Sequence, residues 1–248
     1  MKKFFPQKVM PTIKRLGQLI GLYLGLLLVS GPTSAHSGFT LIPFEAKYTA
    51  YKWNDDVGSV TIKLTPLAKN QYSLTYASKV SKFFLSDERF EHSIFFYEDG
   101  SITPYQYFYR REGTGPDKNL EVKFSTRPNK HIEISDSETV VWQGETDNQL
   151  YRLDLAKQLA SGADSAAYDF INYRGEKKSY GIEVMGKATL SLPYGKLNTI
   201  KVKLIRQNSS RETFAWFAPS LNYNLVRLQQ FKDGEEQGDI RLLSYQTL

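Results

Sequence analysis

The chain has 248 residues, no cysteine, and a formal charge of +6 that is concentrated at one end. The first 35 residues contain five basic and no acidic side chains, so 27 basic and 26 acidic residues remain, a net charge of +1. A near-neutral chain lacks the clustered positive charge on which nucleic-acid binding depends. Without cysteine a disulfide scaffold is excluded, and burial of apolar side chains must stabilise the fold.

The N-terminal segment has the layout of a secretory signal peptide. Basic residues from Lys2 to Arg15 precede an apolar run, Leu19 to Val29, and small residues follow up to Ala35. A membrane-spanning helix needs about 20 apolar residues, so a retained anchor is the weaker alternative. We therefore predict a signal peptide over 1–35, cleaved near Ala35, and a periplasmic location without a stable membrane anchor. Residues 36–248 are expected to form a single β-rich domain.

Alternation of apolar and polar residues with period two dominates the mature chain and predicts β-strands. The segments Phe44–Ala50, Val60–Leu64 and Tyr72–Val80 are separated by turn residues, which indicates a meander. Further alternating segments follow at 90–96, 105–109, 120–124, 132–134 and 140–142.

One segment departs from period two. Between Asp147 and Ser161 the residues Leu150, Leu153 and Ala156 recur at helical spacing. Asp147 is expected to cap the N-terminus of this helix and Gly162 to stop it.

Alternating segments resume at 180–192, 199–204, 213–217, 226–228 and 240–242. More than ten short strands and one main helix predict an all-β, mostly antiparallel fold. Its form would be a large curved sheet, half-barrel or barrel-like; a closed barrel or a sandwich is the alternative. Around Trp216, apolar residues point to both faces of one strand. We expect that strand to be covered on both sides, with Ala215 facing the helix.

With these segments in place the mature chain resembles a bacterial envelope family, domain of unknown function 3108. The residues that carry the resemblance are Thr213–Tyr223 with Leu225–Leu228, Phe44–Tyr48, Ile102–Tyr105, and Leu192–Gly195 before Thr199–Val202. The resemblance implies an exported β-rich protein of Gram-negative bacteria and brings no established activity, cofactor or catalytic residue.

Candidate catalytic and metal-binding residues are few. Of the three histidines, His36 lies at the expected mature N-terminus, His92 on a strand face and His131 beside a loop, and no two have metal-ligand spacing. No Gly-x-Ser-x-Gly motif occurs, and most paired acids lie next to glycine turns. We therefore expect no enzymatic activity, no metal and no cofactor.

The surplus of aromatic residues gives the one candidate site. Tyr105, Tyr107 and Tyr109 alternate along one strand and Arg111 continues the stripe. They are interpreted either as ordinary packing against the sheet or as an amphipathic ligand-binding wall with Arg111 at its mouth.

Two functions remain open: a non-enzymatic carrier of a lipid or other envelope amphiphile, and a protein–protein adaptor or assembly factor that pairs through exposed strand edges. A continuous apolar cavity would favour the carrier. A filled core with a flat apolar patch would favour the adaptor.

Overall fold

The computed structural model describes residues 39–248. The predicted signal peptide, its cleavage near Ala35 and His36 lie outside these residues. Within the described part of the chain, no helix has the length and apolar character needed to cross a membrane.

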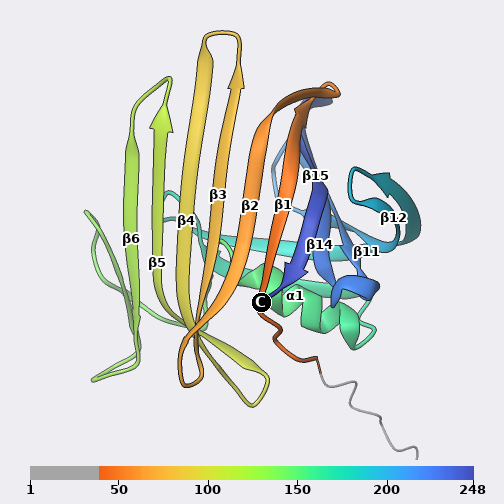
Figure 1. The fold of residues 1–248 in the computed structure, drawn as a ribbon. Helices are drawn as coiled ribbons and strands as arrows, with labels where there is room; N and C mark the ends of the chain where they lie inside the picture. Colours follow the sequence, from red (N-terminus) through yellow and green to blue (C-terminus); the bar gives the residue numbers. More distant parts are fainter. Residues whose placement is uncertain (1–38) are drawn as a thin grey trace, which may run out of the picture. The chain divides into compact units, whose positions relative to one another are not determined.

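In this part of the chain fifteen strands form one curved sheet (Figure 1). The strands of the first half are β1 (Phe44–Lys52), β2 (Asp55–Ala68), β3 (Gln71–Lys82), β4 (Leu85–Glu98), β5 (Ser101–Gly113), β6 (Lys118–Ser125), β7 (His131–Ile134) and β8 (Val140–Val141). Those of the second half are β9 (Thr146–Asp147), β10 (Ser165–Ile171), β11 (Lys177–Leu192), β12 (Gly195–Ile205), β13 (Arg211–Ala218), β14 (Asn224–Lys232) and β15 (Glu235–Thr247).

The topology consists of two meanders that meet at the centre of the sheet. The chain enters at β1, runs outward strand by strand to β8 at one edge, reappears as β9 at the other edge, and returns inward to β15. There β15 pairs with β1 over Phe44–Tyr51. Of the described pairings, β9 with β10 is parallel and the rest are antiparallel. Since β8 and β9 are free edges, the sheet is open. The predicted fold class is confirmed, and its open half-barrel form is the one adopted.

The single helix connects the two parallel strands of the sheet. Residues 142–145 carry the chain from β8 at one edge to β9 at the other, and α1 (Tyr151–Ala160) then joins β9 to its parallel neighbour β10 and lies against the inner face of the curved sheet (Figure 1). Parallel neighbours need a crossover connection of this kind, which is usually a helix. A 3-10 turn, Pro219–Leu221, is the other helical segment among the described residues.

The helix starts later than the sequence predicts. Asp147 is the last residue of β9, and its Oδ1 accepts hydrogen bonds from the backbone amides of Gln149 (2.8 Å) and Leu150 (3.0 Å). These bonds form a turn before the helix, whose own N-cap residue, Leu150, makes no side-chain cap. Gly162 ends the helix as predicted, with a φ of +85° that a glycine adopts freely.

The main core lies between α1 and the inner face, where Leu153, Leu155 and Leu159 pack against strand residues. A second cluster forms under β5, β6 and β7 around Tyr107, Val122 and Ile132. The strand at Trp216 is covered on both sides, as predicted, but by different means. Ala215, Trp216 and Phe217 all belong to the main core, and Lys201 and Arg227 cover the Trp216 ring, 5.3 and 4.8 Å from its centroid.

Candidate functional site

The predicted tyrosine stripe is divided between the two faces of β5. Tyr107 and Tyr109 are buried on the inner face, while Tyr105 is 48% exposed and contacts the Phe96 ring at 5.8 Å. The cause is a β-bulge at this position, where the β4–β5 register shifts between Ile94 and Phe95. The prediction that all three tyrosines share a face is therefore wrong.

The inner two tyrosines and Arg111 already have partners. The Tyr107 hydroxyl donates to Glu91 Oε2 (2.8 Å), and burial raises the pKa of Tyr107. Tyr109 packs on the ring of Tyr173 at 5.3 Å. Arg111 forms an ion pair with Asp87. In this arrangement the tyrosines pack as ordinary sheet residues, and their contact with a ligand remains a prediction.

The histidines behave as structural residues. His92 is half-buried on β4, where the sequence predicts a strand; its Nε2 lies 2.9 Å from Ser73 Oγ, and desolvation lowers its pKa. His131 begins β7 and uses both ring nitrogens, toward Asn129 O (2.7 Å) and Glu133 Oε1 (3.0 Å). Residues 39–248 contain no group of three metal-ligating side chains.

A buried polar cluster lies where the turn before α1 meets β4. Glu91 Oε2 accepts a hydrogen bond from Asn148 (2.7 Å) as well as from Tyr107, and Gln149 Nε2 donates to Ser93 Oγ (3.1 Å). Asp147 is fully buried beside them, and this burial raises its pKa to about 6. Asp147 Oδ2 and Gln149 Oε1 have no hydrogen-bond partner among the described residues.

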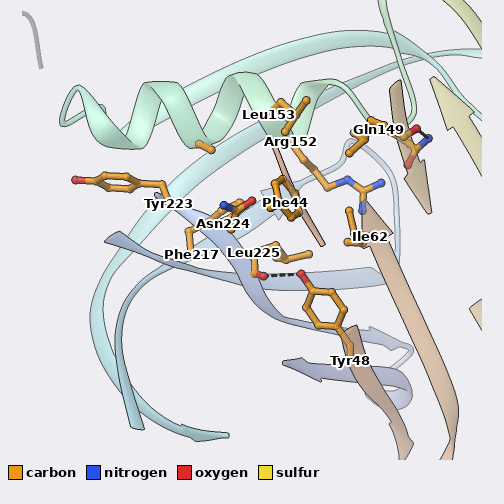
Figure 2. Close-up of a pocket in the computed structure, with 12 residues that line it drawn as sticks. Phe44, Tyr48, Ile62, Gln149, Arg152, Leu153, Phe217, Tyr223, Asn224 and Leu225 are labelled. Atoms are coloured by element: carbon orange, nitrogen blue, oxygen red, sulfur yellow. Dashed lines mark hydrogen bonds between the residues drawn. The ribbon is translucent and has the colours of Figure 1, made fainter. Parts of the chain in front are cut away.

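Gln149 also borders a cavity beneath α1, which is the candidate site (Figure 2). The cavity measures about 30 Å³, room for about two water molecules. Its walls are mainly apolar and come from α1, from β1 to β3, and from the β13–β14 region; they include Phe44, Tyr48, Ile62, Leu74, Leu153, Ala156, Phe217 and Leu225. The Tyr48 hydroxyl is not free, because it donates to Leu225 O at 2.7 Å.

Arg152 is the one cation that lines this cavity. Figure 2 shows its guanidinium extending from α1 between Gln149 and Ile62. Among the described residues no hydrogen bond or ion pair to the Arg152 guanidinium is found, and the Tyr151 ring lies 5.8 Å from the guanidinium carbon. Burial opposes its charge, but the fields of Tyr151, Glu91 and further tyrosines outweigh this and raise the pKa of Arg152. The cation is thus held charged in a largely apolar site.

An aromatic wall with an arginine at its mouth was one of two interpretations of β5, and ligand binding there stays a prediction. The structure also has an arginine beside apolar and aromatic side chains beneath α1, where Arg152 lines the cavity with Phe44 and Tyr48. A signal for it was present, since Gln149, Arg152, Leu153 and Ala156 recur at intervals of three and four and so share one face of a helix. An arginine on the apolar side of the chain's main helix could have been singled out.

An open antiparallel sheet that curves around one helix defines the class, and a solved structure shares it. The β-barrel-like protein of domain of unknown function DUF1849 from Brucella abortus superposes with a TM-score of 0.57 at 8% identity, covering 85% of this chain and 99% of that one. A putative exported protein with a YmcC-like fold from Bacteroides fragilis gives a TM-score of 0.33 at 11% identity, covering 84% and 97%. A search of the curated proteins finds no match.

The family follows from the sequence itself. The model of the family described as "Protein of unknown function (DUF3108)" matches residues 44–241, and the chain belongs to this family.

Proposed function

We propose that the protein is a non-enzymatic periplasmic envelope protein that binds an amphiphile with an anionic head group beneath α1. The observation that carries the proposal is Arg152, a cation without a hydrogen-bonded partner among the described residues, at the wall of an apolar cavity. A charged group in such a place is costly unless it is paired, and a carboxylate or phosphate offers the bidentate partner that a guanidinium fits.

The remaining walls suit an apolar tail. Leu153 and Ala156 face the cavity from α1, and Ile62, Phe217 and Leu225 face it from the sheet. The cavity as it stands holds only about two waters, so an acyl chain requires α1 to move away from β1 and β14. The other side of the helix is held by the Tyr151–Phe170 stack (5.3 Å) and by Lys157 Nζ, which donates to Gly100 O (2.9 Å). These contacts would hold one side of α1 in place while its cavity-facing side moves away from β1 and β14.

The test is a calorimetric titration of residues 36–248 with laurate and with the neutral dodecyl maltoside. We expect Arg152→Gln to bind laurate about 10- to 100-fold more weakly, since a hydrogen bond to a charged group contributes about 1.5–3 kcal/mol. Maltoside binding should not change. Arg110→Gln is the matched control, because Arg110 is exposed and pairs with Glu112 at 3.4 Å. Equal laurate affinity in Arg152→Gln and the wild type would refute the proposal, as would a wild type that binds no laurate.

The adaptor alternative is favoured by one observation at the sheet edge. In β8, Val140 and Val141 are 42% and 74% exposed on a strand whose outer side pairs with no described strand. Such an edge can take up a strand of an envelope protein partner. A partner bound there would slow amide exchange in β8 and would bind Arg152→Gln as tightly as the wild type, which separates the two functions.

A further inference from the structure

Three hairpin turns meet at one end of the sheet, the upper end in Figure 1, away from α1. The β1–β2 turn holds Trp53, the β3–β4 turn holds Phe83 and Phe84, and the β5–β6 turn follows Gly113. Lys82 Nζ lies 4.8 Å from the Trp53 ring centroid, which joins the first two turns. Thr114 joins the β5–β6 turn to the β3–β4 hairpin, since its Oγ1 accepts from Ser86 N (3.0 Å) and its amide donates to Ser86 O (2.9 Å).

This end exposes large apolar side chains to an unusual degree. Phe83 and Phe84 are 91% and 98% exposed, Leu85 is 65% and Trp53 is 60% exposed. We call these four residues the aromatic tip. Large exposed apolar groups gathered in one place mark an interaction surface.

The turn geometry indicates that these aromatic residues do not stabilise the turns in which they lie. Trp53 has a φ of +55° and Phe83 a φ of +56°, a left-handed conformation that is rare for bulky side chains. Other two-residue turns of the same sheet use the residues that this conformation favours: Asp99-Gly100 between β4 and β5, and Asp233-Gly234 between β14 and β15. The β1–β2 and β3–β4 turns therefore both have a bulky aromatic residue at a left-handed position that favours Asn, Asp or Gly, and both expose that ring to solvent.

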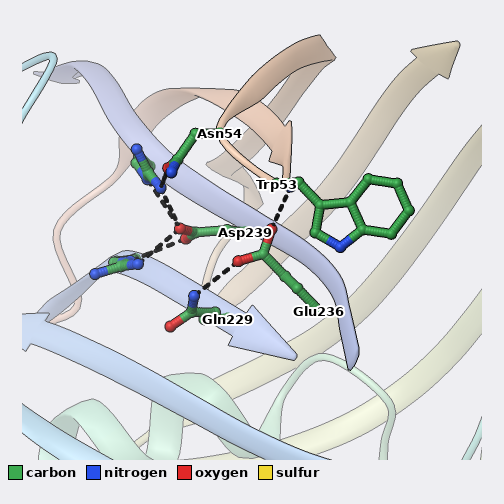
Figure 3. A network of polar contacts seen from close by, with 7 residues as sticks. Trp53, Asn54, Gln229, Glu236 and Asp239 are labelled. Atoms are coloured by element: carbon green, nitrogen blue, oxygen red, sulfur yellow. Dashed lines mark hydrogen bonds and ion pairs between the residues drawn. The ribbon is translucent and has the colours of Figure 1, made fainter. Parts of the chain in front are cut away.

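The Trp53 turn is also held firmly in place (Figure 3). Its backbone amide donates to Glu236 Oε1 (2.6 Å), and Asn54 Oδ1 accepts from Arg241 (2.7 Å). Arg241 and Arg227 both pair with the buried carboxylate of Asp239, at 2.8 and 2.7 Å. In Figure 3 the indole ring points away from this network, so the ring is presented outward from a rigid base.

We propose that the aromatic tip inserts into the surface of a lipid bilayer. The rings stand at the ends of separate hairpins, and a fluid apolar layer accepts protruding rings without a matched pocket. The Lys52 and Lys82 ammonium groups lie 4.9 and 4.8 Å from the Trp53 ring. Tryptophan at head-group level with lysines reaching the phosphates is the arrangement typical of membrane interfaces. Two nearby acids already have partners: Asp55 pairs with Lys82 (3.0 Å), and Glu236 accepts a hydrogen bond from the Trp53 amide (2.6 Å).

The first test is co-sedimentation of residues 36–248 with vesicles of phosphatidylethanolamine and phosphatidylglycerol. We expect the wild type to sediment with the vesicles, and the double variant Phe83→Gly with Phe84→Ser to bind at least about tenfold more weakly. The glycine suits the left-handed position, so this variant should melt at the wild-type temperature or above. Leu67→Ser is the control, since Leu67 is 52% exposed near the β2–β3 turn at the other end of the sheet.

The tryptophans supply an independent readout. Trp142 and Trp216 are only 9% and 5% exposed, so a blue shift of emission on adding vesicles, with quenching by brominated lipid, would report Trp53. The shift should disappear in Trp53→Phe and persist in Arg152→Gln, because the tip is independent of the cavity beneath α1. A wild type that stays in the supernatant would overturn the proposal, and so would equal binding by the double variant. Loss of a protein partner in that variant, without any vesicle binding, would assign the tip to a protein instead.

Discussion

At the residue scale, Asp147 combines a structural role with an unfavourable environment. Its Oδ1 holds the turn before α1 through two backbone amides, while its Oδ2 is buried without a partner among the described residues. Burial raises its pKa from 3.8 to about 6. Because the folded protein then binds this proton more tightly than the unfolded chain does, the contribution of Asp147 to stability falls as pH rises from about 4 to about 6 and is constant above.

Asp147→Asn should remove this pH dependence. The amide keeps an oxygen for the two backbone donors and has no charge to bury. We expect urea unfolding of the variant to lack a stability loss of roughly 2–3 kcal/mol between pH 4 and pH 6.5, and the variant to be the more stable protein at pH 7.5. Asp136→Asn, in an exposed turn, should leave the wild-type slope unchanged. An unaltered slope in Asp147→Asn would show that Asp147 does not cause it.

Single residues also show where the sequence was insufficient. The side of β5 on which Tyr105 lies depends on a bulge, and alternation along one strand carries no information about an extra residue in a ladder. Arg111 and Arg152 both follow aromatic residues in the sequence. In the structure Arg111 faces the carboxylate of Asp87 on the neighbouring strand β4, whereas the Arg152 guanidinium has no such partner among the described residues. Partners of this kind are determined by strand register, which the sequence does not reveal.

At the scale of elements, β5 and β13 each contain a buried aromatic residue whose truncation is expected to destabilise the fold. Tyr107 and Trp216 are 0% and 5% exposed and belong to different core clusters. Truncation of a buried aromatic residue typically costs about 3–5 kcal/mol. Trp216→Ala should lie at the lower end, since the stems of Lys201 and Arg227 can settle over the gap.

The measurement is chemical unfolding of Trp216→Ala and Tyr107→Ala beside the exposed control Tyr105→Ala, which should change stability by less than about 0.5 kcal/mol. A Tyr107→Ala protein as stable as the wild type would remove Tyr107 from the core and restore it as a candidate ligand contact.

Most element types were predictable, because inner-face residues of β1 and β2 alternate strictly and the 150–160 segment does not. The start of α1 was not, because the side-chain oxygen of Asp147 can satisfy the amides of a tight turn as well as those of a helix.

At the scale of the whole domain, the open curved sheet was predictable as a class, whereas its strand order was not. The pairing that joins the two meanders brings Phe44 opposite Thr247, and alternation does not specify which distant strand is the partner. The pairing of β1 with β15 leaves β8 and β9 as edges. The helix α1 connects β9 to β10, and the cavity beneath it is lined by β1, β2, β3 and the β13–β14 region. The cavity could therefore not be located before the strand order was known.

The central claim is that an anionic amphiphile occupies this cavity, and photo-crosslinking tests it most directly. A fatty acid with a diazirine near its tail end would be bound to residues 36–248, irradiated, and its adducts mapped by mass spectrometry. We expect adducts on Leu153 or Ala156 and on Leu225, competed by laurate and greatly reduced in Arg152→Gln. Adducts confined to Phe83–Leu85, or adducts on α1 that persist unchanged in Arg152→Gln, would contradict the account.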